Sequence, residues 1–343
     1  MPGGFKRFLD MALSGEPLGR EGAREAMDFL ISGKLEPAQI AGFLKAVGPG
    51  QLGAGELAGF AETMRANAVS LTIDRRPLVD TCGTGGDGLG TFNFSTAAAL
   101  VTAGAGVAVA KHGNRAVSSR SGSADVLEAL GIAVDPGPEA VREAIEQDGF
   151  GFLFAPRYHP AMRHVAPVRK ALGIRTVFNL LGPLVNPALV KRQVVGLYDR
   201  NLMEIYAETL LLLGAEQVMV VRGEDGMDEF TLTGTTFICH GDQTGGVRTE
   251  RITPEDVGLK RAESGKLAGG DAAANAKILI AVLEGAEGPI SDGTCFNAAA
   301  ALLVAGAVPT LKDGIAAARE SISSGRARNV LEKLRSRIKR GAS

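Results

Sequence analysis

A glycine-rich turn lies between an expected strand at residues 78–82 and a helix expected to begin near Ala97. Its backbone N–H groups and the positive end of the helix dipole favour an anion. Hydroxyl and amide side chains fill the gap before the helix and can bind phosphate or hydrated magnesium: Thr91, Asn93, Ser95 and Thr96. The segment predicts a phosphate site, and a plain tight turn is the alternative for the glycines taken alone.

A second polar stretch follows the next expected strand, at residues 107–110. It begins with Lys111, His112, Asn114 and Arg115 and continues with Ser118, Ser119, Ser121 and Ser123 before an expected helix at 124–130. Hydroxyls at a second helix start predict a second anion-binding segment. Glycines 83, 85 and 88 also fit GxGxxG, but a dinucleotide fold expects an acidic residue about 20 residues later. Cations stand there instead, which argues against a nicotinamide dinucleotide.

Four carboxylates lie within six residues after an expected strand at 217–221: Glu224, Asp225, Asp228 and Glu229. Most acidic clusters of this kind are solvated loops. Ligands of α/β sheets bind at the carboxyl ends of the strands, and carboxylate oxygens suit magnesium. We therefore treat Asp228 and Glu229 as candidate metal ligands.

The apolar pattern divides the chain into two parts. Up to about residue 70 it is helical, with apolar stripes at 23–31 and 40–47 and a third helix at 56–68. From Pro77 onward short apolar runs alternate with helical stretches, which is typical of a mostly parallel sheet covered by helices. Residues 241–270, rich in glycine and charge, are expected to form a surface excursion. The predicted class is α/β, with a small N-terminal all-helical domain and a larger α/β domain.

Composition excludes several classes of protein. The 343 residues are 45% hydrophobic and 22% charged, as in an ordinary globular protein. A formal net charge of −1 gives no general attraction for nucleic acid. Cys82, Cys239 and Cys295 fit no disulfide or zinc pattern, so we expect buried thiols in a reducing cytoplasm. No secretory signal is evident, and the uncharged stretch 89–110 holds too many polar residues and glycines for a membrane span.

These segments, together with 159–169, 179–184 and 225–229, resemble the anthranilate phosphoribosyltransferases, in order and over nearly the whole chain. The resemblance implies transfer of the phosphoribosyl group from phosphoribosyl pyrophosphate to the amine of anthranilate in tryptophan biosynthesis, yielding N-(5-phosphoribosyl)anthranilate and pyrophosphate. It implies a homodimer of the nucleoside-phosphorylase type. The helical domain, residues 1–70 plus about 166–186, would serve dimerisation, and 71–165 with 187–343 would form the phosphoribosyltransferase domain. Association with anthranilate synthase is left open.

The resemblance also assigns the donor and metal residues. Departure of pyrophosphate from an oxocarbenium-like state needs positioning and charge neutralisation, so neither a covalent nucleophile nor a general base is expected. Two magnesium ions per subunit are implied, with Ser95, Asp228 and Glu229 as ligands. The residues expected to bind phosphoribosyl pyrophosphate are Gly83, Gly86, Asp87, Thr91, Asn93, Phe94, Ser95, Thr96, Lys111, His112, Gly113, Asn114, Arg115, Ala116, Val117, Ser118, Ser119 and Ser123.

Anthranilate, a flat ring with a carboxylate, needs one well-held cation beside apolar surface. If Pro160 begins a helix, Met162, Val165 and Arg169 share its apolar stripe, while Arg163 and Lys170 point elsewhere. We expect Arg169 to bind anthranilate, and the resemblance implies that Asn114 and the backbone of Gly83 complete this site, with His112, Tyr158 and His159 as further wall candidates. An arginine that extends from a core helix to solvent is the alternative for Arg169.

Two other proteins of this fold remain as rivals. A pyrimidine nucleoside phosphorylase is expected to differ at Lys111 to Asn114 and at the Asp228–Glu229 pair. A nucleic-acid-binding relative without catalysis is expected to be basic and altered in the serine-rich stretch, whereas this chain is neutral and keeps the stretch intact.

Overall fold

A central sheet organises the computed structural model, which describes residues 4–116 and 120–341. Within these residues seven strands pair in the order β3-β2-β1-β4-β5-β6-β7. The strands are β1 (Leu78–Gly83), β2 (Ala108–Gly113), β3 (Phe150–Phe154), β4 (Arg192–Gly196), β5 (Gln217–Gly223), β6 (Thr236–Asp242) and β7 (Gly246–Ile252). The first five run parallel to one another, whereas β6 and β7 add an antiparallel edge beside β5. The predicted α/β class with a mostly parallel sheet is confirmed.

The edge strands correct one expectation. The first part of the segment 241–270 is not an excursion, because β6 and β7 form a hairpin that continues the sheet. Most of β7 is exposed, so its charged residues face solvent and hide the strand pattern in the sequence. Only after Ile252 does the chain leave the sheet, through two short 3-10 helices, η5 (Pro254–Val257) and η6 (Ser264–Leu267).

One face of the sheet is covered by helices that pack around a central helix of small residues. They are α5 (Phe94–Gly104), α12 (Ala272–Leu283), α13 (Pro289–Val304), α14 (Leu311–Ser323) and α15 (Arg326–Gly341), with α6 (Ser123–Ala129) beside α12. Helix α5 is nearly all buried and contacts α13, α14 and α15. Glycine is needed at Gly104, where a Cβ would lie 2.5 Å from the backbone nitrogen of Ala327. Small residues in α5 therefore permit this close packing.

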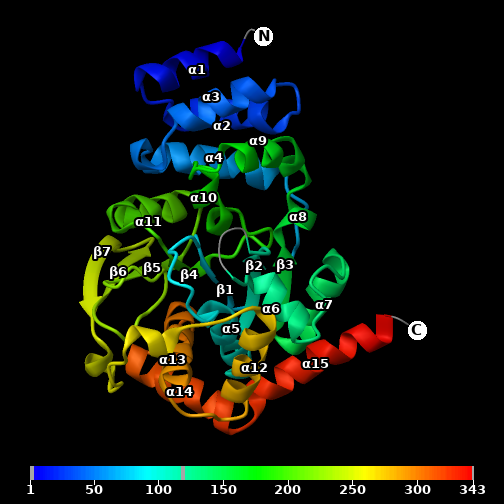
Figure 1. The fold of residues 1–343 in the computed structure, drawn as a ribbon, viewed down its shortest axis with the longest axis vertical. Helices are drawn as coiled ribbons and strands as arrows, with labels where there is room; N and C mark the ends of the chain where they lie inside the picture. The colour runs from blue at the N-terminus through cyan, green and yellow to red at the C-terminus, as the bar shows by residue number, and fades with distance from the viewer. Residues whose placement is uncertain (1–3, 117–119, 342–343) are drawn as a thin grey trace.

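The N-terminal residues form a separate helical layer, at the top of Figure 1. It contains α1 (Phe5–Ser14), α2 (Gly19–Ile31), α3 (Pro37–Ala46) and α4 (Ala54–Ala66), with the short η1 (Pro49–Gln51) before α4. Buried Glu56 accepts hydrogen bonds from the backbone nitrogens of Leu18 (2.7 Å) and Gly53 (3.0 Å). One carboxylate thus satisfies free N–H groups at the starts of both α2 and α4.

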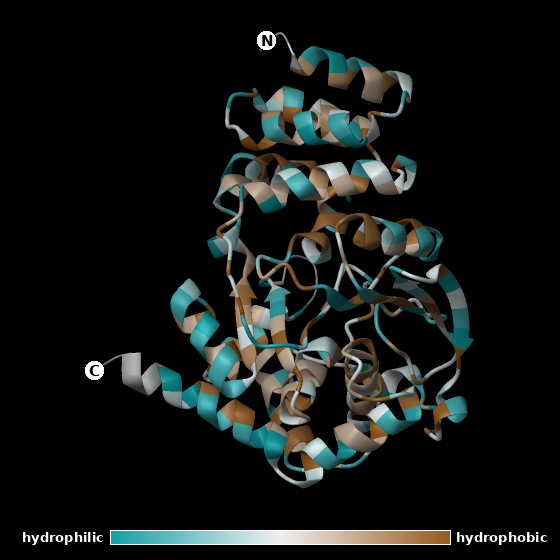
Figure 2. Ribbon diagram, turned by 180° about the vertical axis from the view of Figure 1, so that it is seen from behind, coloured by the Kyte–Doolittle hydropathy of each residue, from teal (hydrophilic) through white to brown (hydrophobic). Residues whose placement is uncertain are grey.

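A later part of the chain joins this layer to the sheet. It includes α8 (Ala155–Tyr158), η2 (Pro160–His164), α9 (Ala166–Leu172), α10 (Phe178–Leu181), η3 (Gly182–Val185), η4 (Arg200–Leu202) and α11 (Met203–Leu212). Helix α9 contacts α3, and α10 and η3 contact α4. Figure 2 shows largely hydrophobic residues between the N-terminal helices and the sheet, where one apolar cluster extends from Phe5 to Val195 and Val220. No helix in the described ranges is long and apolar enough to cross a bilayer.

Partly buried Arg65 joins the two layers. Its Nε donates to the carbonyl of Leu184 at 2.7 Å and its Nη1 to that of Leu213 at 3.1 Å. Burial lowers the pKa of Arg65 to about 10, so the guanidinium remains charged at neutral pH. The guanidinium at the end of α4 therefore donates hydrogen bonds to backbone carbonyls of η3 and of the turn after α11.

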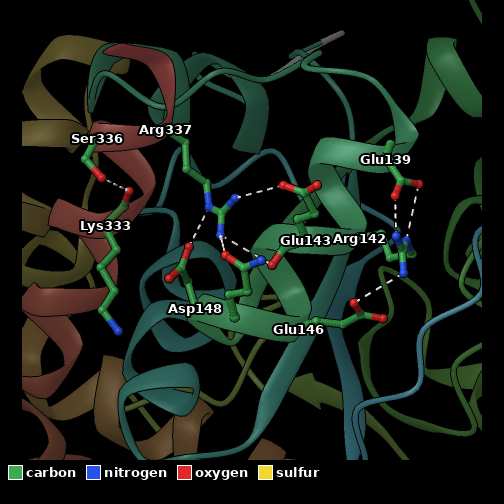
Figure 3. A network of polar contacts seen from close by, with 9 residues as sticks. Glu139, Arg142, Glu143, Glu146, Asp148, Lys333, Ser336 and Arg337 are labelled. Atoms are coloured by element: carbon green, nitrogen blue, oxygen red, sulfur yellow. Dashed lines mark hydrogen bonds and ion pairs between the residues drawn. The ribbon is translucent and has the colours of Figure 1, made fainter. Parts of the chain in front are cut away.

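The last helix is held at its far end by ion pairs with α7 (Pro138–Asp148) (Figure 3). Arg337 donates to Asp148 and to Gln147 Oε1 at 2.9 Å, and it lies 3.6 Å from Glu143 Oε2. A single exposed ion pair contributes little, but a network on one guanidinium fixes its geometry. Helix α15 therefore joins α5 and α7 on the same side of the sheet.

The crossing of α2 and α4 supplies a test of the helical layer. A Cβ at Gly59 would lie 2.2 Å from the carbonyl oxygen of Arg20, whereas one at Gly55 would have its nearest neighbour at 3.9 Å. We expect Gly59→Ala to lower the free energy of unfolding by about 1–3 kcal/mol through overpacking. Gly55→Ala, on the same helix, should stabilise by about 0.5–1 kcal/mol through helix propensity. Urea unfolding measures both, and equal effects would contradict the packing of these helices.

Candidate active site

A pocket of about 200 Å³ lies at the carboxyl ends of β1 and β2. The chain order of the parallel strands changes direction between β1 and β4, and ligands of open α/β sheets bind at such a point. The lining residues are Cys82, Gly83, Gly85, Gly86, Asp87, Gly90, Thr91, Phe92, Asn93, Ser95, Thr96, Lys111, His112, Gly113, Arg120, Ser121, Gly122, Ser123, Asp228, Glu229, Gly270 and Asn275. Backbone N–H groups, small hydroxyls and ionisable side chains thus share one cavity.

The structure brings most of the expected donor residues to this pocket and leaves four described ones outside it. Asn114, Arg115 and Ala116 are not lining residues, and Phe94 is buried in the core with its ring 5.3 Å from that of Phe92. Val117, Ser118 and Ser119 fall outside the described residues.

Arg115 is directed toward α6 instead. Its Nη1 lies 3.1 Å from Asp125 Oδ1 and 2.7 Å from Glu128 Oε2. Asp125 also accepts from the backbone nitrogens of Ala116 and Gly122, both at 2.9 Å. These side chains on the first turns of α6 therefore hold Arg115, Ala116 and Gly122 against the start of the helix.

Helix α5 begins earlier than expected, at Phe94 rather than near Ala97. The carbonyl of Asn93 accepts from the backbone nitrogens of Thr96 and Ala97, both at 3.1 Å, and so starts the helix. Ser95 and Thr96 consequently lie in its first turn, at the positive end of the helix dipole, which favours anions. One such anion is within the protein, because Ser95 N donates to Glu229 Oε1 at 3.0 Å.

Asp228 and Glu229 lie directly against the glycine-rich turn. Asp228 Oδ2 accepts from Gly85 N at 2.8 Å. A Cβ at Gly196 would stand 1.6 Å from the carbonyl oxygen of Asp228, and one at Gly83 2.5 Å from its Oδ2. Only glycine at the ends of β1 and β4 therefore lets the acidic segment reach the pocket.

The acidic pair is destabilised in its charged form. Burial, and then the charge of Asp87, raises the pKa of Asp228 to about 6. Burial, and then the charge of Asp228, raises the pKa of Glu229 to about 8, while Lys111 opposes the shift. Asp87 Oδ2 is buried without a hydrogen-bond partner in the described part of the chain. Crowded carboxylates with a free oxygen fit a divalent cation, which would favour their charged forms.

The protein by itself offers few ligands to such a cation. Among residues 4–116 and 120–341, no group of three or more His, Cys, Asp and Glu side chains is arranged to hold a metal. Magnesium commonly binds through one or two carboxylates and completes its shell with water and substrate phosphate. The donor set therefore fits magnesium carried with a phosphate substrate, and Ser95 contacts Glu229 at the same place.

A buried charge network lies beneath the pocket. Lys111 is 2% exposed, and its Nζ donates to the carbonyl of Thr81. Fully buried Asp80 accepts from Asn186 Nδ2 at 2.8 Å and from His112 N at 3.3 Å. Burial raises the pKa of Asp80, and Lys111 opposes the shift. The Lys111 ammonium is thereby fixed at the pocket floor, where it favours an anion.

His112 adds a neutral acceptor. Its Nδ1 lies 3.0 Å from the carbonyl of Gly182, which can only accept, so Nδ1 carries the proton. Burial, with a contribution from His159, lowers the pKa of His112 to about 3. The rings of His112 and His159 pack edge to face at 5.2 Å. Nε2 of His112 is buried with no partner among the residues that the structure describes, so it can accept a substrate N–H or O–H.

Arg169 lies on a different element from the one expected and does not line the pocket. The expected single helix from Pro160 is wrong, because η2 ends at His164 and α9 begins at Ala166. Pro167 has no N–H and is tolerated only in the first turn, so it forces a new helix start. Arg169 is partly buried, its guanidinium lies 5.1 Å from the Phe178 ring, and burial lowers its pKa.

Four residues that the sequence analysis did not single out also belong to this region. Arg120, Gly270 and Asn275 line the pocket. Arg175 donates to the carbonyl of Gly86 and stacks 4.2 Å from the ring of Tyr198. Arg120 adjoins the serine-rich stretch and could have been included with it. The signal for Asn275 was one amide in a helix that is otherwise apolar except for Lys277, and Gly270 and Arg175 carried no distinctive pattern.

The acidic pair makes stability depend on pH when no metal is bound. Folding favours protonated Glu229, so this contribution to stability is complete below about pH 4.5 and is lost as the pH rises toward 8. In EDTA, we expect Glu229→Gln to reduce the fall in unfolding free energy between pH 5 and pH 8. Glu224→Gln, an exposed member of the same cluster, serves as the control. Denaturant titrations test this, and parallel pH curves for all three proteins would contradict it.

Comparisons with known proteins agree over both parts of the chain. Residues 6–68 match the helical bundle domain of the glycosyl transferase family, and residues 75–328 match its a/b domain. The anthranilate phosphoribosyltransferase of Moorella thermoacetica is 52% identical over 323 residues, 94% of this chain and 95% of the relative.

Solved structures agree as well. The crystal structure of anthranilate phosphoribosyltransferase from Thermus thermophilus has a TM-score of 0.88 and 48% identity, covering 96% of this chain and 98% of that one. The Saccharomyces cerevisiae enzyme in complex with PRPP and Mg has a TM-score of 0.89 at 30% identity, covering 97% of both chains. The chain therefore belongs to the anthranilate phosphoribosyltransferase family.

Proposed function

We propose that this protein transfers the 5-phosphoribosyl group of phosphoribosyl pyrophosphate to the amine of anthranilate. The observation that carries the proposal is the pocket in which the glycine-rich turn, the first turn of α5 and Lys111 meet the Asp228–Glu229 pair. N–H donors and an ammonium recognise a diphosphate, and the carboxylates recognise the cation that accompanies it. A phosphoribosyl donor presents both groups at once.

The donor is held by positioning groups. Gly83, Gly86, Thr91, Ser95 and Thr96 face its diphosphate, and Lys111, His112 and Ser123 lie toward the second polar stretch. Because these groups are already oriented in the pocket, charge that develops on the leaving pyrophosphate meets fixed donors. For Arg115 to contact the donor, its pairs with Asp125 and Glu128 must be exchanged for phosphate oxygens.

Asp87, Asp228, Glu229 and Ser95 would hold magnesium, at two ions per subunit. Magnesium bound with the diphosphate neutralises its charge and so makes it a better leaving group. The protein's part is to keep two carboxylates beside the diphosphate, through the N–H groups of Gly85 and Ser95. With Lys111 nearby, Glu229 faces both a protein cation and the expected metal.

The acceptor side needs a cation and a neutral acceptor. Anthranilate's amine is uncharged at neutral pH, so it attacks C1′ without prior deprotonation as the C1′–O bond to pyrophosphate breaks. The nitrogen then loses one proton to the departing pyrophosphate or to solvent, and no protein nucleophile enters the reaction. Arg169 supplies the cation for the carboxylate beside the ring of Phe178, and Asn114 and Gly83 contact the same substrate. Neutral Nε2 of His112 can accept an N–H from the amine or an O–H from the ribose.

The helical layer completes the proposed enzyme. Residues 166–186 contact α3 and α4, so we assign them, with residues 1–70, to a domain that carries a homodimer interface. The remaining α/β residues hold the donor. An association with anthranilate synthase is compatible with this arrangement and is tested by co-purification.

The reaction is tested by the loss of anthranilate fluorescence when purified protein, magnesium and phosphoribosyl pyrophosphate are mixed. We expect a rapid loss that requires all components, together with release of one pyrophosphate for each anthranilate consumed. Omission of each component in turn provides the controls. A folded protein that leaves the fluorescence unchanged would refute the proposed reaction and would direct attention to nucleoside phosphorolysis.

The acceptor assignment predicts a selective kinetic effect. Arg169→Ala should raise KM for anthranilate by about 10-fold or more, because a charge-assisted contact to the carboxylate is lost. KM for phosphoribosyl pyrophosphate should change much less. Lys170→Ala removes the adjacent exposed cation and should leave both constants near wild type. Equal increases for both substrates in Arg169→Ala would remove this residue from the acceptor site.

A further inference from the structure

A chain of side-chain amides crosses the wall of the pocket. Asn275, on α12, is 1% exposed, and its Nδ2 donates to Asn93 Oδ1 at 2.7 Å. Asn93 Nδ2 donates in turn to the carbonyl of Ser121 at 3.1 Å. On the other side, Asn275 Oδ1 accepts from Gly270 N at 2.7 Å. The amides therefore connect the loop before α12, the start of α5 and the serine-rich stretch.

The direction of this chain is fixed at both ends by backbone groups. The Gly270 N–H can only donate, so the oxygen of Asn275 must face it. The Ser121 carbonyl can only accept, so the nitrogen of Asn93 must face it. Between the two amides, Nδ2 of Asn275 then necessarily meets Oδ1 of Asn93. A flip of either amide would place oxygen against oxygen or N–H against N–H.

The segment next to Asn275 also holds the glycine-rich turn. Phe92 N donates to the carbonyl of Leu267 and Gly269 N to that of Gly90, both at 3.0 Å. A Cβ at Gly269 would stand 2.7 Å from the carbonyl oxygen of Thr91 and 2.9 Å from Asn275 Oδ1. The loop before α12 and residues 90–93 are thus fitted to each other, and Asn275 extends this contact to Ser121.

We infer that Asn275 is a positioning residue for the phosphoribosyl donor. By fixing the orientation of Asn93, it holds the hydroxyl-bearing first turn of α5 at a set distance from Ser121. The first turn of α5 and residues 120–123 line the same pocket. The inference rests on the proposed function, because it takes the ligand of that pocket to be phosphoribosyl pyrophosphate with magnesium. Asn275 acts through Asn93 and Ser121, so its loss should affect donor binding and leave recognition of anthranilate by Arg169 intact.

The test uses Asn275→Asp and Asn275→Leu, two replacements of similar size. The aspartate keeps an acceptor for Gly270 N–H, but its ionised carboxylate cannot donate to Asn93. When protonated, it can donate again, whereas leucine can do so at no pH. Each variant is compared with wild type at the same pH, because the same pocket is lined by other ionisable residues: Asp87, Lys111, His112, Arg120, Asp228 and Glu229.

Calorimetric titration with phosphoribosyl pyrophosphate and magnesium, without anthranilate, measures the effect at pH 8.5 and pH 6. We expect both variants to bind the donor about 10-fold or more weakly than wild type at pH 8.5. Asn275 is 1% exposed, so burial should raise the pKa of a carboxyl at this position well above its usual range. At pH 6, Asn275→Asp should therefore recover part of the loss, and Asn275→Leu should not. In steady-state assays, KM for the donor should follow the same pattern while KM for anthranilate changes little.

Two results would overturn the inference: wild-type donor binding in both variants at pH 8.5, or equal losses that do not respond to pH, which would indicate packing alone. If neither variant folds, Asn93→Asp tests the other link, and failure to recover donor binding at pH 6 would count against it. Donor binding without turnover in the wild type would refute the proposed reaction. The role of the amide chain through Asn275 and Asn93 would still be tested by the binding titrations.

Discussion

The close approach of the Asp228 backbone to the ends of β1 and β4 is the constraint on which the site depends. Gly83 and Gly196 end these adjacent parallel strands, and any side chain at Gly196 would occupy the space of the Asp228 carbonyl. The approach brings two carboxylates to the edge of the sheet where the glycine-rich turn begins. The acidic pair, the turn and the start of α5 thus form one unit because two strands end in glycine.

This arrangement places like charges close together. The carboxylates accept hydrogen bonds from the backbone nitrogens of Gly85 and Ser95, and Lys111 lies near enough to oppose the shift in the pKa of Glu229. These contacts offset part of the free-energy cost of burying and crowding the two charges. The cost that is not offset raises the pKa values of Asp228 and Glu229. A cation would gain from relieving this residual repulsion, so the site is preorganised for metal at a cost to the stability of the metal-free protein.

Much of the fold could be predicted because its signals are local. The apolar runs at 78–82, 150–154 and 218–221 are confirmed as β1, β3 and β5, and the glycine turn follows β1 as expected. The errors arose where local patterns competed or were absent. Pro167 divided an apparently continuous stripe into η2 and α9, and the exposed face of β7 concealed a strand. Gly196, Asn275 and Arg175 reach the site only through contacts between segments distant in sequence, which no spacing in the chain could reveal.

A continuous segment links Arg169, the proposed anthranilate cation, to the pocket, which Arg169 does not line itself. Arg169 packs on Phe178 at the start of α10, and the segment continues into Gly182, whose carbonyl holds Nδ1 of His112 in the pocket. The same segment is fastened to α4 by the bond from Arg65 to Leu184. A shift of the helical layer relative to the sheet would therefore move the proposed anthranilate cation and change the support of the His112 ring together. Since Asp80 accepts a hydrogen bond from the backbone nitrogen of His112 within the sheet, the imidazole lies where the two layers meet, and its orientation depends on both.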